Sequence, residues 1–160
     1  MKKLLVPISI FSIVSCTPAA PNLQELKAPI VVAAAKDSPQ GVRPLGVNQI
    51  IGKITLSGAR DLEQLKVKVP TEFSNIKVFQ GPTQLSATAA LPGFDGIIAF
   101  SMEQMIPDGT NKEIIIRADT DRIQKDPISG QREVVIQIYS IKEKGKEEKI
   151  LNLALPKVLY

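Results

Sequence analysis

Three aspartates that follow a predicted strand carry oxygen atoms of the kind that bind hard metal ions. Asp119 and Asp121 are separated by one residue, and Asp126 follows shortly after them. Carboxylates grouped in one loop are ligands that Ca²⁺ prefers. The spacing departs from the EF-hand pattern, because Ile123 occupies the fifth position and the sixth position lacks glycine. Two interpretations are therefore open: a weak Ca²⁺ site, or a solvated turn that leads into Pro127.

A single cysteine, Cys16, is the other residue with distinctive chemistry. One thiol excludes an internal disulfide, a CxxC redox pair and a cysteine-rich zinc site. The chain has no histidine, which excludes imidazole metal ligands, histidine general bases and the Ser-His-Asp and Cys-His catalytic arrangements. Aromatic residues make up 4% of the chain, too few for a platform that stacks sugars or single-stranded nucleic acid. We expect no cofactor.

The residues that end at Cys16 have the organisation of a secretion signal. Lys2 and Lys3 form a basic start, and the apolar run Leu4–Val14 that follows is too short to cross a bilayer ~30 Å thick. Ile13-Val14-Ser15-Cys16 resembles the lipobox of bacterial lipoproteins. The resemblance implies removal of residues 1–15, a diacylglyceryl group on the Cys16 thiol and acylation of the new amino group. The alternatives are an ordinary signal peptide with a stray cysteine and an uncleaved anchor.

Two further groups of residues resemble catalytic patterns, an S-x-x-K motif and a set of acidic side chains. Ser74-Asn75-Ile76-Lys77 matches the S-x-x-K motif of penicillin-binding serine enzymes, which needs a helix so that the lysine reaches the serine. Here the motif enters an alternating strand, where Ser74 and Lys77 point to opposite faces. A glycosidase-type pair needs two carboxylates about 5–10 Å apart. The available acids lie beside turns or on outer faces, and we expect no enzyme; they are Glu103, Asp108, Glu113 and Asp119.

The segment of residues 16–47 has the composition of a lipid-anchored flexible linker. Thr17 to about Asn48 contains five of the twelve prolines, which remove backbone donors and favour extended conformations. Within it, Ala28–Ala35 is more apolar. That run is either part of the linker, a stretch near the lipid surface or a docked edge strand. Residues 48–160 are then the folded domain.

From Gln49 onward, apolar residues recur with the period of two that is typical of β-strands. Turn residues, mostly glycine after serine or aspartate, separate the runs. We expect no helix beyond one turn near Met102–Ile106. The sequence predicts an all-β domain, a single Ig-like or transthyretin-like β-sandwich. The predicted strands are Ile50–Ser57, Leu65–Val69, Asn75–Gln80, Gly96–Met102, Glu113–Ala118, Glu133–Ile141 and Ile150–Leu155.

Three smaller features have alternative interpretations. Lys142–Lys149 contains four lysines and three glutamates, which favours a solvated hairpin tip over a membrane-binding surface. Pro156–Tyr160 is expected to form a last edge strand, with a partner-binding tail as the alternative. The aromatic residues are expected to pack in the core or on a sheet face rather than in a ligand site; they are Phe73, Phe79, Phe94, Phe100 and Tyr139.

The stretch Ile51–Ala118 resembles the carboxypeptidase regulatory-like, transthyretin-like domains of bacterial surface proteins. Such domains open with G-x-V-x-x-x-G, here Gly52–Gly58, and continue with D-x-x-G-x-F-x-F, here within Pro92–Phe100. Ile98 replaces the first phenylalanine of the second pattern, and no tyrosine follows Gly109 in a third. The resemblance implies a non-catalytic structural or adhesive module and carries over no functional residues.

The charge balance and the residue after the lipobox bear on partners and location. Removal of Lys2 and Lys3 leaves 18 basic against 16 acidic side chains, too even for a nucleic-acid surface. In the lipoproteins that this motif resembles, those retained in the inner membrane of bacteria with two membranes usually have Asp after the cysteine. This chain has Thr17 there, which favours the outer membrane. The predicted function is a lipoprotein, held to membrane lipid through acylated Cys16, with a structural, adhesive or envelope-assembly role toward a protein or envelope-polymer partner. The alternative is a small-ligand or Ca²⁺-binding periplasmic module.

Overall fold

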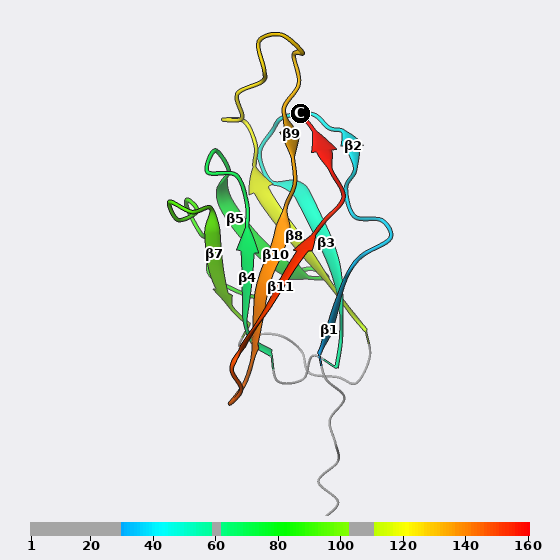
Figure 1. The fold of residues 1–160 in the computed structure, drawn as a ribbon, viewed down its shortest axis with the longest axis vertical. Coiled ribbons are helices and arrows are strands. Elements are labelled where there is room, and N and C mark those ends of the chain that lie inside the picture. The colour runs from blue at the N-terminus through cyan, green and yellow to red at the C-terminus, as the bar shows by residue number, and fades with distance from the viewer. Residues whose placement is uncertain (1–29, 59–61, 103–110) are drawn as a thin grey trace, which may run out of the picture.

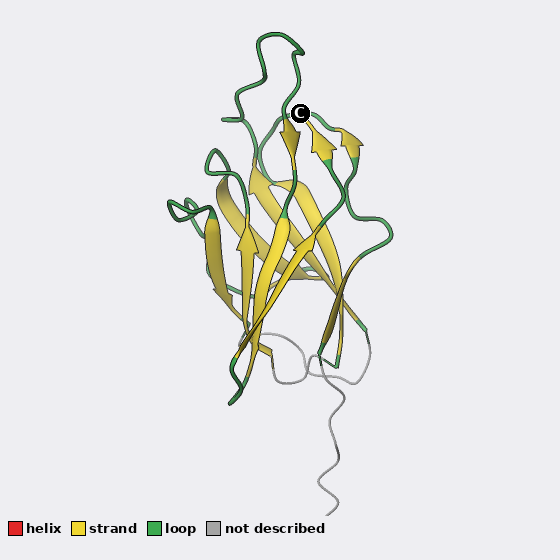
Figure 2. Cartoon of the chain, in the orientation of Figure 1, coloured by secondary structure: helices red, strands yellow, loops and turns green. Residues whose placement is uncertain are grey.

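The strands form two large facing sheets and a small third sheet, without a helix in residues 30–58, 62–102 and 111–160, which the computed structural model describes (Figures 1 and 2). The strand orders are β1-β3-β8-β5-β6 and β11-β10-β4-β7 in the two large sheets and β2-β12-β9 in the small sheet. The expected all-β sandwich is confirmed. The strands are β1 Val31–Ala34, β2 Gly41–Val42, β3 Gln49–Ser57, β4 Leu62–Lys68, β5 Ser74–Gln80, β6 Thr83–Gln84, β7 Ile97–Ser101, β8 Lys112–Asp119, β9 Glu133–Val134, β10 Gln137–Glu143, β11 Glu148–Ala154 and β12 Val158–Leu159.

The two large sheets bury the faces that the alternation predicted to be apolar. Strands β5 and β8 turn isoleucines and valines inward, and β4 and β10 do the same from the opposite sheet. Each buried aliphatic side chain contributes about 1.5–3 kcal/mol, which fixes the inward face of every strand. The most deeply buried of these residues are Ile54, Leu56, Leu65, Val67, Ile76, Val78, Ile114, Ile116 and Ile138.

The folded domain begins earlier than the predicted boundary at residue 48. Strand β1 pairs antiparallel with β3, from Val31 opposite Ser57 to Ala34 opposite Ile54, and Ile30 and Ala35 are buried beside it. The edge-strand alternative is therefore confirmed, and the linker prediction is wrong for residues 30–47. Prolines flank this run without interrupting it, so the composition of the whole segment concealed a strand.

Two β-bulges change which side chains face the core. In β3 the register shifts between Ile50 and Gly52, so Ile51 is buried, while Ile50, which shares the alternation of the buried Ile54, is only half-buried. In β10 a shift after Ile138 buries the neighbours Ser140 and Ile141 together. A bulge adds one residue to one strand of a pair, which resets the alternation beyond it.

The chain end and one aromatic residue differ from the expectation. Strand β12 lies between β2 and β9, so the last segment is a central strand of the small sheet instead of an edge. Phe73 and Phe100 are buried as predicted, but Phe94 is fully exposed, which makes its assignment to the core wrong. Phe94 lies in the turn between Gly93 and Gly96, where the chain reverses outside both sheets.

The predicted turn glycines that the structure describes have positive φ values, and Gly96 shows why one of them is required; Gly109 lies outside the described residues. Its φ of 77° lies in the left-handed region. A Cβ at Gly96 would lie 2.4 Å from the carbonyl oxygen of Val69, while the Gly96 carbonyl accepts a 2.9 Å hydrogen bond from the Val69 amide. The turn that presents Phe94 is therefore held closely against the end of β4.

The antiparallel pairing gives the sandwich two distinct ends (Figure 1). Residue 30 enters at the end that also carries the β10–β11 hairpin, whose tip is exposed and holds an ion pair between Lys146 and Glu143. The opposite end carries the loop before β7, the loop between β8 and β9, and the small sheet β2-β12-β9. We call these the entry end and the distal end.

Candidate functional site

Two aspartates of the predicted Ca²⁺ loop, Asp119 and Asp126, accept hydrogen bonds from different parts of the chain. Asp119 accepts hydrogen bonds from the Asn75 side chain at 2.6 Å and the Asn48 backbone amide at 2.7 Å. Asp126 accepts from the backbone amides of Ile128 and Ser129 and closes its own turn. No cluster of three metal-binding side chains occurs within the described residues. The convergence of Asp119, Asp121 and Asp126 that the Ca²⁺ interpretation requires is therefore not seen in this part of the chain, and the turn closed by Asp126 agrees with the alternative of a solvated turn.

Asp119 instead fastens two backbone segments that adopt an uncommon conformation. Asn48 and Asn75 have φ values of 53° and 50°, and both are bonded to the Asp119 carboxylate. The Asn75 side-chain hydrogen bond, followed by the Asn48 amide, lowers the pKa of Asp119. The ionised carboxylate thus joins the starts of β3 and β5 to the end of β8.

We expect Asp119→Asn to lower the free energy of unfolding more at pH 7 than at pH 3. Because its pKa is depressed in the fold, ionised Asp119 stabilises the protein above about pH 4, and this contribution is lost as the pH falls through the folded pKa. Urea unfolding at both pH values measures the difference. Asp121→Asn, at an exposed neighbour, is the matched control and should stay within about 0.5 kcal/mol of wild type. An equal loss at both pH values would contradict this assignment.

The structure does not support the other catalytic patterns in the described residues. Glu113 and Asp119 lie on the outer face of β8, six residues apart, which corresponds to about 20 Å along a strand. Ser74 is buried while Lys77 lies on the opposite, outer face, as predicted for a chance S-x-x-K match. The described ranges leave out residues 103–110, which include Glu103, Asp108 and most of the expected turn near Met102–Ile106. They also leave out Cys16.

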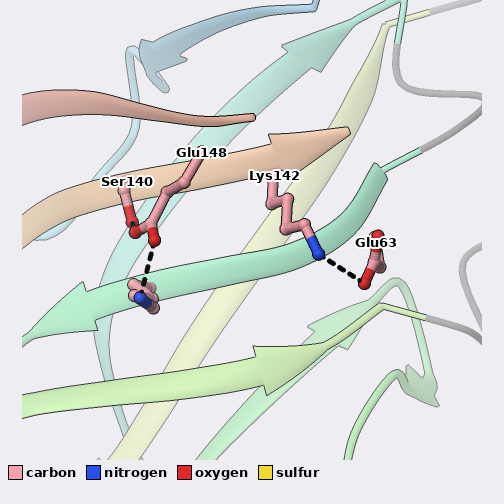
Figure 3. A network of polar contacts seen from close by, with 5 residues as sticks. Glu63, Ser140, Lys142 and Glu148 are labelled. Atoms are coloured by element: carbon pink, nitrogen blue, oxygen red, sulfur yellow. Dashed lines mark hydrogen bonds and ion pairs between the residues drawn. The ribbon is translucent and has the colours of Figure 1, made fainter. Parts of the chain in front are cut away.

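A polar network crosses the outer face of β4, β10 and β11 (Figure 3). Glu148 accepts hydrogen bonds from Lys66 at 2.8 Å and from the buried Ser140 hydroxyl, and Lys142 pairs with Glu63 at 3.0 Å. The Lys66 hydrogen bond and then the Ser140 bond lower the pKa of Glu148. The buried Ser140 hydroxyl, which lies next to the bulge in β10, thus has a hydrogen-bond partner, and the network joins the three strands.

A hollow of about 350 Å³ lies beside β3, where the segment between β1 and β2 meets the chain end. It brings together residues from three separate parts of the sequence. Tyr160 is held there by two backbone hydrogen bonds with Arg132 and by an edge-to-face contact with Phe73, 6.2 Å between ring centroids. The residues that line the hollow are Asp37, Pro39, Arg43, Pro44, Gln49, Ile50, Lys53 and Tyr160.

The charged groups of the hollow are not equivalent. Lys53 bonds to Asp37 and lies 3.5 Å from Glu113, which raises the pKa of Lys53, through Asp37 above all. The Arg43 backbone amide donates to the Leu159 carbonyl at 2.8 Å, but its guanidinium has no ion-pair partner among the described residues. Burial raises the pKa of Tyr160, and the nearby charge of Arg43 acts in the opposite direction. The hollow therefore holds one cation, Arg43, that is not ion-paired within the described residues.

The distal end concentrates exposed apolar side chains. Phe94 and Ile128 are almost fully exposed, from two different loops, and Leu91 precedes Phe94 in the same loop. Of the large apolar side chains that are exposed in the described residues, only Val31 and Ile150 lie elsewhere. The members at the distal end are Val42, Val47, Leu91, Phe94, Ile128 and Val135. We call this set the distal apolar residues.

Neither of these two sites was predicted from the sequence. The Pro92-Gly93 and Asp95-Gly96 pairs that flank Phe94 are turn signals, and they would have indicated exposure. For Arg43, Lys53 and Tyr160 the sequence contains no comparable signal. The described ranges hold no helix long and apolar enough to span a membrane. Comparisons with protein-family models, with curated proteins and with solved structures find no match to this chain.

Proposed function

We propose that this chain is a bacterial lipoprotein, anchored through acylated Cys16, that displays a non-catalytic β-sandwich to a protein or polymer partner of the cell envelope. The proposal places the anchor in the outer membrane of a cell with two membranes, because Thr17 follows the cysteine. Several acyl chains provide durable attachment, whereas one chain alone gives only marginal membrane binding.

The observation that carries the proposal is the separation of the two ends. Residue 30, which follows the proposed tether, enters at one end, and the distal apolar residues lie at the other (Figure 1). Most of the large apolar side chains that are exposed in the described residues lie at this end, and contiguous apolar surface marks interaction sites. A module that is tethered to the membrane at its entry end presents the distal apolar residues away from the membrane, where a partner has access to them.

Two features of the sequence support a role without catalysis. The chain lacks histidine. The resemblance of Ile51–Ala118 to carboxypeptidase regulatory-like domains implies a structural or adhesive module. Loops at one end of a rigid sandwich are a common position for recognition residues.

Site-specific photocrosslinking in cells tests the display of the distal end. A photoreactive amino acid at Phe94 or Ile128 should give the same higher-mass adduct, which mass spectrometry then identifies. The same probe at Val31 or Ile150, which are exposed apolar residues away from the distal end, is the matched control and should give none. Adducts from the control positions alone, or none from either distal position, would contradict the proposal.

A second candidate function, small-ligand binding, is favoured by the hollow beside β3. Its volume of about 350 Å³ falls within the range of small-molecule sites, which runs from about 300 to 1,000 Å³. Its polar groups converge from three segments, as a binding site requires. Of the two forms of this alternative, the hollow supports the one that binds a small ligand.

A further inference from the structure

We propose that the hollow beside β3 binds a small monoanionic carboxylate with an apolar body, held by the Arg43 guanidinium and the Tyr160 hydroxyl. This inference deepens the second candidate function and is independent of the lipid anchor and of the distal end. Its failure would leave the display proposal unchanged.

The charged groups of the hollow favour an anion with one negative charge. Arg43 and Lys53 are the positive groups of the lining and Asp37 is the negative one, and Glu113 adds a second carboxylate 3.5 Å from Lys53, so the two cations and the two carboxylates balance. Lys53 is already bonded to Asp37, so the unpaired guanidinium is the group that gains most from a ligand. The Asp37 carboxylate repels a second negative charge, which disfavours a phosphate dianion.

Arginine and tyrosine suit a carboxylate in their donor geometry. A guanidinium forms two parallel hydrogen bonds with the two oxygens of a carboxylate. Arg43 and Tyr160 both line the hollow, and the charge of Arg43 lowers the pKa of Tyr160 against the effect of burial. The Tyr160 ring is held by its edge-to-face contact with Phe73, so a ligand that contacts this residue does not bear the entropy cost of ordering a free side chain.

The remaining walls accommodate an apolar body. Pro39, Pro44 and Ile50 supply aliphatic surface, and the Tyr160 ring adds an aromatic face. The bulge in β3 turns Ile50 away from the core and into this wall. A volume of about 350 Å³ admits a small acid or one terminal residue of a peptide, which share this carboxylate chemistry.

NMR titration of the purified full chain in detergent with benzoate tests the proposal. Benzamide has the same ring and no charge, so it is the matched control ligand. We expect saturable shifts of the Ile50, Lys53 and Tyr160 amide resonances with benzoate, and binding at least about tenfold weaker with benzamide or with Arg43→Gln, as expected for loss of a charged hydrogen bond. Arg122→Gln, at an exposed arginine on the β8–β9 loop, should bind benzoate like wild type.

The outcomes of these titrations distinguish a carboxylate site from a hollow that binds no carboxylate. They also distinguish the two sources of the carboxylate, which are a free acid and a peptide carboxyl terminus. N-acetylphenylalanine in a parallel titration represents a peptide carboxyl terminus, and tighter binding than benzoate would assign the hollow to peptide ends. Tighter binding of benzoate would assign it to free acids. Equal binding of benzoate and benzamide, unchanged affinity in a folded Arg43→Gln variant, or no saturable shift at the lining residues with either acid would overturn the proposal.

Discussion

Replacing Cys16 with alanine is expected to abolish acyl labelling and to remove the protein from the outer-membrane fraction. The thiol is the proposed attachment point for the diacylglyceryl group, and the cut before residue 16 depends on that group. Each acyl CH₂ buried in lipid contributes about 0.8 kcal/mol, so loss of the chains lowers the outer-membrane fraction by more than about tenfold. Fractionation with a gel assay of size measures both effects, since the uncleaved variant keeps residues 1–15.

Ser15→Ala is the matched control for this experiment. It keeps a small residue next to the cut and leaves the thiol in place, so labelling, processing and membrane attachment should resemble wild type. An ordinary signal peptide predicts a different result, in which Cys16→Ala is processed and located like wild type. That outcome would contradict the proposed anchor.

Phe73→Ala is expected to destabilise the domain by about 3–5 kcal/mol and to lower its Tm by roughly 10–20 °C. Phe73 is fully buried and packs edge-to-face on Tyr160, so truncation leaves a cavity that the surrounding strands fill only in part. Domains of this size are stable by only about 5–15 kcal/mol, so this single change removes much of the total. Thermal and urea unfolding measure the loss.

Phe94→Ala makes the same chemical change at a fully exposed position. Its stability should remain within about 0.5 kcal/mol of wild type, because no packing is lost. The same variant should reduce adduct formation from a photoprobe at Ile128 if the distal apolar residues bind one partner. A large loss of stability in Phe94→Ala, or none in Phe73→Ala, would contradict the assignment of these two residues.

The alternation of apolar residues predicted the sandwich and most of its strands. Ile76 and Val78, or Leu65 and Val67, face inward because burial of aliphatic groups outweighs any local preference along a short strand. The turn glycines were predictable for a related reason, since few other residues adopt a positive φ at low cost. These features depend on residues close together in the sequence.

The features that the sequence did not predict depend on contacts between distant segments. The bulge at Ile51 is set by the pairing of β3 with β8, about seventy residues away, so the local alternation alone does not show that Ile51 rather than Ile50 is buried. Strand β1 was hidden because its pairing with β3 outweighs a proline-rich context. The hollow joins Lys53 of β3 to Arg43 and Tyr160, which directly follow strands of the small sheet, and those two-residue strands leave no periodic pattern in the sequence.

Mass spectrometry of the N-terminal tryptic peptide from the membrane-purified protein tests the lipid anchor most directly. Trypsin cleaves after Lys3 and Lys27, and no lysine or arginine lies between them. The proposal predicts a peptide that begins at Cys16, ends at Lys27 and carries the mass of a diacylglyceryl group. A peptide that begins at Leu4, runs through to Lys27 and has an unmodified thiol would contradict it.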